Sequence, residues 1–252
     1  MKVLGFAAVL TAMTLSAAGA QATEFVTNGG FEQSSYDHNT QFGASFGGQG
    51  VTGWTGLGNS GGVQHLEFYY RGGTQTSENA TNQYGDPEGY LWDSFNTLSS
   101  QGGNFVGLDS GPPYQGVIEQ QINGLTIGQS YHLSFEWAGG QLHNRSGPTF
   151  DQVEVQFGSD DVTTALVNVA DHGFTGWMTQ TYDFTATGAS QTLRFLAVGG
   201  PGGLPPIAAI DNISLTGGVP EPAAWALMLV GFGGLGAALR RRRARLACAA
   251  TA

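Results

Sequence analysis

Apolar and polar residues alternate along much of the chain between residues 24 and 215. From Tyr131 to Trp137, every second side chain is aromatic or aliphatic, and those between are polar or charged. Segments 178–184 and 193–197 repeat this period of two. Because successive side chains of an extended strand point to opposite faces, the pattern predicts half-buried β-strands.

The intervals between these segments are rich in residues that form turns. Glycine accounts for 41 of the 252 residues. Glycine favours turns over helix interiors, and residues 23–218 contain no clear amphipathic helix. The expected fold is an all-β, antiparallel sandwich, although periodicity alone leaves jelly-roll and immunoglobulin-like topologies open. Further strands are expected at residues 25–32, 104–111, 116–125, 151–158 and 208–215.

The N-terminus has the pattern of a secretory signal peptide at residues 1–22. Lys2 precedes an uncharged, mostly apolar run, and two sites of the A-x-A type follow at residues 18–22. Such a pattern is read by a signal peptidase. We therefore expect cleavage near Ala20 or Ala22 and export of the remaining chain; the alternative is a buried helix or an uncleaved anchor.

The C-terminus combines an apolar segment with a cluster of arginines. Residues 223–239 carry no charge, and these 17 residues reach the lower limit for crossing a bilayer. Arginines beside a transmembrane helix remain on the cytoplasmic side, so the order predicts a transmembrane helix followed by a basic stop. The arginines are Arg240, Arg241, Arg242, Arg243 and Arg245.

The residues that lead into this segment resemble the PEP-CTERM sorting tail, in its PEPxxWA form. The matching positions are Pro220, Glu221, Pro222, Trp225 and Ala226. The resemblance implies a Gram-negative bacterium in which an exosortase, a membrane transpeptidase, recognises and cleaves a tail at residues 219–252. The protein would be anchored transiently in the inner membrane and then passed to the cell surface or to an exopolysaccharide matrix.

Charge is distributed unevenly along the chain. Only three of the nine basic residues, Arg71, Arg145 and Arg194, lie within residues 23–218, together with 18 of the 19 acidic residues. The net charge there is therefore near −15, compared with −10 for the whole chain. So acidic a surface repels nucleic acid and excludes nucleic-acid binding. The only cysteine is Cys248, so residues 23–218 must form one domain around an apolar core without a disulfide.

Several short motifs resemble the galactose-binding-like jelly roll of many carbohydrate-binding modules. They are residues 28–32, Gly53-Trp54, residues 127–137 and residues 205–215. The resemblance implies a jelly roll with a structural Ca²⁺ ion that ties the first strand to the last. Glu32 and Asp211 occupy the matching positions, and the alternative is that Glu32 ends a strand in solvent and Asp211 caps a turn.

Residues 55–103 form an insertion that is too long for an ordinary connection between strands. Its aromatic residues are mixed with amides and carboxylates. Sugar binding typically needs an aromatic face with polar groups around it. We therefore predict carbohydrate contacts at Tyr69, Tyr70, Tyr90 and Trp92; the alternative is that these rings pack the insertion onto the sandwich.

No sequence motif supports catalysis. The chain lacks a nucleophile elbow, a P-loop and a dinucleotide-binding fingerprint. A carboxylate pair for glycoside hydrolysis is the remaining option, and the residues available are Glu119, Glu136, Asp151 and Glu154. We expect a protein that is not an enzyme and that binds extracellular polysaccharide. The alternatives are a structural or adhesive surface protein without a small ligand, and a polysaccharide-cleaving enzyme.

Overall fold

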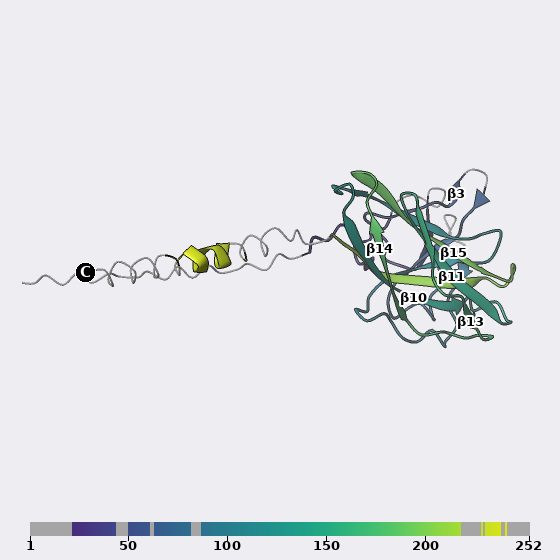
Figure 1. The fold of residues 1–252 in the computed structure, drawn as a ribbon. Coiled ribbons are helices and arrows are strands. Elements are labelled where there is room, and N and C mark those ends of the chain that lie inside the picture. The colour runs from purple at the N-terminus through teal and green to yellow at the C-terminus, as the bar shows by residue number, and fades with distance from the viewer. Residues whose placement is uncertain are drawn as a thin grey trace, which may run out of the picture. The chain divides into compact units, whose positions relative to one another are not determined.

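The computed structural model describes residues 22–43, 50–60, 63–81, 87–217, 228, 230–237 and 240. Residues 23–218 form one compact unit, and the remaining residues form another. The first unit contains two hydrophobic cores and two large β-sheets (Figure 1). A unit with its own cores has what an independently folding domain requires.

The two sheets contain most of the strands. The larger sheet runs in the order β14 (Met178–Thr185), β10 (Ser130–Gln141), β16 (Pro206–Gly217), β8 (Phe105–Asp109), β5 (Glu67–Tyr70), β1 (Thr40–Phe42), β6 (Ala80–Thr81) and β7 (Pro87–Gly89). The smaller runs β12 (Asp160–Thr163), β11 (Thr149–Phe157), β15 (Ser190–Gly200), β9 (Val117–Asn123) and β2 (Thr55–Gly56), with β13 (Val167–Val169) also paired to β11. A hairpin joins β3 (Asn59–Ser60) to β4 (Val63–Gln64).

The order of the strands confirms the predicted sandwich and resolves its topology. Consecutive strands β8 to β11, and then β14 to β16, alternate between the two sheets. This alternation is the winding of a jelly roll. Neighbouring strands in both sheets are antiparallel, apart from the pair β1 and β6.

The strand predicted at residues 25–32 is wrong. These residues form a turn in which Asn28 and Phe31 have φ angles of 55° and 57°. Gly29 explains the close approach of this turn to β16, because a Cβ atom at that position would lie 1.7 Å from the carbonyl oxygen of Ile213. Only glycine permits such contact between backbones.

The main core lies between the two sheets. It is built from the alternating apolar residues that the sequence pattern singled out, including Phe135 of β10 and Phe195 of β15. The rings of these two residues meet edge to face, with centroids 5.1 Å apart. Phe157 and Phe184 make a second contact between the sheets, at 5.6 Å.

A second core covers the opposite face of the larger sheet. There the insertion places Leu91 and Phe95 against the outward-facing side chains of β5, β8, β10 and β16. These strands are consequently buried on both faces at this end. The burial of β5 follows from this arrangement, because Tyr69 packs in the main core and Tyr70 in the second.

In the other unit, Met228, residues 230–237 and Arg240 are helical. Across the part of the chain that the structure describes, no helix has both the length and the apolar character needed to cross a membrane. Residues 223–227, 229, 238 and 239 of the apolar segment, and residues 1–21 of the predicted signal peptide, lie outside the described residues. The transmembrane helix and the signal peptide therefore stay predictions.

Candidate functional site

Four aromatic side chains form a continuous row on the surface of the sandwich. We call Tyr90, His143, Trp92 and His172 the aromatic row. The ring of His143 lies 4.3 Å from that of Tyr90 and 4.2 Å from that of Trp92, measured between centroids. Trp92 also stacks on His172, at 3.6 Å. All four side chains are partly exposed, so parts of the row are open to solvent, although the rings also pack against one another.

Pairing between the insertion and the end of β10 positions the row. Leu91 forms an isolated antiparallel bridge with Leu142, and His143 N donates a hydrogen bond to Tyr90 O over 2.7 Å. In an extended segment, Tyr90 and Trp92 lie on the same side and Leu91 on the other. Leu91 accordingly enters the second core, while the two aromatic rings point away from it.

Hydrogen bonds with neighbouring loops hold Trp92 and His172 in the row. Trp92 Nε1 donates to Arg145 O over 2.9 Å. Ser94 Oγ donates to His172 O over 2.6 Å, and Ser146 Oγ shares a hydrogen bond with His172 Nε2 over 2.9 Å. The row is therefore a fixed feature of the surface and not a set of independent side chains.

The four residues predicted to contact carbohydrate, three tyrosines and one tryptophan, differ in their exposure to solvent. Tyr69 and Tyr70 are only 2% and 0% exposed, so their rings cannot stack on a sugar, and the prediction is wrong for both. Tyr90 and Trp92 come together in the aromatic row, and their role in binding stays a prediction. Sequence reasoning missed His143 and His172, because no local pattern links either residue to the insertion.

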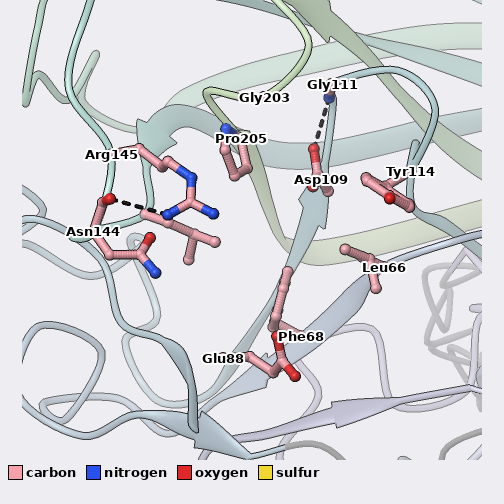
Figure 2. Close-up of a pocket in the computed structure, with 11 residues that line it drawn as sticks. Leu66, Phe68, Glu88, Asp109, Gly111, Tyr114, Asn144, Arg145, Gly203 and Pro205 are labelled. Carbon is pink, nitrogen blue, oxygen red and sulfur yellow. Dashed lines mark hydrogen bonds between the residues drawn. The ribbon is translucent and has the colours of Figure 1, made fainter.

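An open cavity of about 200 Å³ adjoins the aromatic row. The segment 142–145 serves both, because His143 belongs to the row while Leu142, Asn144 and Arg145 line the cavity. Figure 2 shows the guanidinium group of Arg145 directed toward the cavity, with Asp109 and Tyr114 opposite it. The lining residues are Leu66, Phe68, Glu88, Asp109, Gly111, Tyr114, Leu142, Asn144, Arg145, Gly203 and Pro205.

Two buried carboxyl groups, Asp109 and Asp151, interact electrostatically, and Asp109 lines the cavity. Asp109 is 2% exposed and accepts a hydrogen bond from Gly111 N over 2.7 Å. Burial raises its pKa to about 7, since a charged carboxylate is poorly solvated there. Asp151 is fully buried, and Ser110 Oγ donates to its Oδ1 over 2.5 Å. Burial likewise raises the pKa of Asp151 to about 7.

The carboxylates considered for glycoside hydrolysis are distributed over both sheets. Glu136 belongs to β10 of the larger sheet, whereas Glu119, Asp151 and Glu154 belong to the smaller sheet. Glu119 is occupied by an ion pair with Arg194, in which Arg194 Nη2 lies 2.7 Å from Glu119 Oε2. Among the described residues, none of these four lines the cavity.

Glu32 and Asp211 lie near each other but are each engaged within the protein. Glu32 accepts hydrogen bonds from the main-chain N and from Nδ2 of Asn104. Asp211 accepts from Ser99 Oγ over 2.5 Å and from Asn212 N over 2.7 Å. Burial raises the pKa of Asp211 to about 7, and the charges of Glu32 and Glu136 add to this effect. Within the described residues, no group of three or more histidine, cysteine or acidic side chains is placed to hold a metal ion.

The sorting residues fall largely beyond what the structure describes. Pro220, Glu221, Pro222 and Trp225 lie outside the described residues, as do the arginines after Arg240, namely Arg241, Arg242, Arg243 and Arg245. Arg240 itself is helical.

Several solved structures are similar to this chain at low sequence identity. The carbohydrate-binding module TmCBM61, in complex with β-1,4-galactotriose, is 13% identical with a TM-score of 0.40, over 77% of this chain and 97% of that module. The K3 adhesin domain of Lys-gingipain from Porphyromonas gingivalis is 12% identical with a TM-score of 0.42, over 79% and 100%. The CBM22-1 xylan-binding domain from Paenibacillus barcinonensis is 12% identical with a TM-score of 0.34, over 71% and 92%. No curated protein matches the chain in sequence.

The tail gives a specific match to a known sequence family. Residues 218–243 match the PEP-CTERM protein-sorting motif, which confirms the resemblance seen at Pro220, Glu221, Pro222 and Trp225. The motif indicates export and membrane-associated sorting in Gram-negative bacteria. The chain therefore carries a PEP-CTERM sorting motif at residues 218–243.

Proposed function

We propose that residues 23–218 bind extracellular carbohydrate without chemical turnover. The observation that carries this proposal is the aromatic row beside a cavity with polar and apolar walls. Sugar rings have apolar faces that stack on aromatic rings, and hydroxyl groups that need polar partners. In this site Tyr90 and Trp92 supply the rings, while Asn144 and Arg145 supply polar groups.

The sorting motif supplies the location for this activity. We propose that an exosortase cleaves the tail after transient anchoring of the chain in the inner membrane. The carbohydrate-binding unit then reaches the cell surface or the exopolysaccharide matrix, where its ligand is a polysaccharide of that matrix. The net charge near −15 of residues 23–218 favours solubility in that setting.

The test is binding of residues 23–218 to a glycan array and to native exopolysaccharide. Trp92→Ala is expected to weaken binding about ten-fold, the change that about 1.4 kcal/mol produces, because the ring that contacts both histidines of the row is lost. Phe150→Ala removes a partly exposed ring from β11, on the other sheet, and is the matched control. Absence of binding by folded wild-type protein would instead favour a structural or adhesive role.

A structural Ca²⁺ ion at Glu32 and Asp211 is a separate proposal. The repulsion that contributes to the raised pKa of Asp211 supports it, because a divalent cation would neutralise neighbouring carboxylates with the hard oxygen ligands that Ca²⁺ prefers. Calcium should raise the melting temperature of residues 23–218, and EDTA should reverse the increase. A melting temperature that is the same with calcium and with EDTA would exclude the site.

A further inference from the structure

The three arginines of residues 23–218 have different partners. Arg194 is paired with Glu119 through Nε and Nη2, at 3.0 and 2.7 Å from the same carboxylate oxygen. Arg71 Nη1 donates to the main-chain oxygen of Asp37 over 2.6 Å. Among the described residues, Arg145 Nη1 donates to the main-chain oxygen of the preceding residue, Asn144, over 3.1 Å. Within the described residues, Arg145 forms no ion pair with a carboxylate.

Hydrogen bonds at both its main-chain N and its main-chain O fix the backbone of Arg145. Its main-chain oxygen accepts the Trp92 Nε1 hydrogen bond, and its main-chain N donates to Leu142 O over 3.1 Å. The backbone is thus tied to the aromatic row, while the guanidinium group reaches into the cavity (Figure 2). The charge of Arg145 acts on the Asp109 carboxyl group, but no carboxylate among the described residues lies in ion-pair contact with the guanidinium group. The guanidinium group is therefore available to an anionic ligand.

We propose that Arg145 selects a sugar that carries a carboxylate, a uronic acid, at the cavity beside the aromatic row. This inference rests on the proposed carbohydrate-binding function. The planar guanidinium group matches a carboxylate with two parallel N–H···O hydrogen bonds, which no neutral sugar hydroxyl can reproduce. A pyranose ring stacked on the row would place its substituents at the loop that carries Arg145.

The remaining cavity walls restrict how much of a polysaccharide enters. The volume of about 200 Å³ is below the roughly 300–1,000 Å³ of pockets that enclose drug-sized ligands. Glu88 and the acidic surface around the site also oppose a run of negative charges. The site therefore takes one uronic acid residue, at a chain end or between neutral sugars, and not a continuous polyanion.

The neighbouring acid at the cavity is compatible with this ligand. Asp109 faces the cavity from the end of β8, and burial raises its pKa to about 7, although the charge of Arg145 acts in the opposite direction. At a pH below that value it keeps its proton, so it adds no negative charge beside the ligand carboxylate. Tyr114 and Asn144 contribute neutral hydrogen-bonding groups to the same walls.

The test compares matched pairs of sugars on residues 23–218 at pH 6. The probes are the methyl glycosides of glucuronic and galacturonic acid and those of glucose and galactose, titrated by heteronuclear NMR. The wild type is expected to prefer a uronide over its neutral counterpart by about ten-fold, the difference that about 1.4 kcal/mol gives. Arg145→Gln should abolish this preference and leave neutral-sugar binding in place.

Arg71→Gln is the matched control, because it removes the same charge from another exposed arginine and should keep the preference. The inference is overturned if the wild type binds neutral sugars and uronides with equal affinity, or if the preference survives Arg145→Gln. Either result leaves the proposed carbohydrate binding intact. If neither these sugars nor the exopolysaccharide binds to folded protein, the proposed function fails together with the inference.

Discussion

Glu67 provides a quantitative test of how a buried carboxyl group with a raised pKa changes the stability of this fold. Its side chain is 0% exposed within β5, and its carboxylate accepts hydrogen bonds from Val117 N over 3.0 Å and Gly58 N over 3.2 Å. Burial raises the pKa of Glu67 from 4.5 to about 7, although these hydrogen bonds act in the opposite direction. The folded state therefore holds the proton more tightly than the unfolded chain does.

The sign of the pH dependence follows from this difference. Between pH 4.5 and 7 the folded state binds more protons through Glu67 than the unfolded state, so the free energy of unfolding falls as the pH rises. Each pKa unit corresponds to about 1.4 kcal/mol. The wild type should consequently lose about 2–3 kcal/mol between pH 5 and pH 8 through this residue.

The substitution Glu67→Gln removes the titrating group and keeps the shape of the side chain. Urea unfolding of residues 23–218, followed by tryptophan fluorescence, should show the stability of the variant falling about 2–3 kcal/mol less than that of the wild type between pH 5 and pH 8. Any strain from the amide acts equally at both pH values and cancels. Asp161→Asn, at an exposed position of β12, is the control. Equal pH dependence in Glu67→Gln and the wild type would refute the reasoning.

Two further substitutions test the packing of Gly29 against β16 and the raised pKa of Asp151. Gly29→Ala places a Cβ atom 1.7 Å from Ile213 O, so the turn must separate from β16. We expect the free energy of unfolding to fall by about 2 kcal/mol or more. An unchanged urea midpoint would contradict this prediction. Asp151→Asn removes the ionisation of a carboxyl group whose pKa burial raises to about 7. Stability at pH 8 should therefore rise relative to the wild type, with a smaller effect at pH 5; reduced thermal stability at pH 8 would count against the raised pKa.

Much of the candidate site depends on pairings between distant parts of the chain. Trp92 was identifiable as an aromatic residue in a long insertion, but its ring partner His172 lies 80 positions away in the sequence. Arg145 was visible as one of three cations in the acidic region, whereas its place at a cavity depends on the bridge between Leu91 and Leu142. Neither relation leaves a local pattern, because tertiary contacts have no fixed spacing in sequence.

The alternation of apolar and polar residues determined the fold class by itself. A period of two suffices for a strand with one face in the core, and strands such as β10, β11 and β15 follow it closely. The sorting motif was likewise readable from the sequence, because the residues of the motif are contiguous. Only the tertiary structure decided that Tyr69 and Tyr70 are buried and not available for binding. The insertion covers the outer face of the larger sheet, so both faces of β5 are buried and neighbouring aromatic rings enter opposite cores.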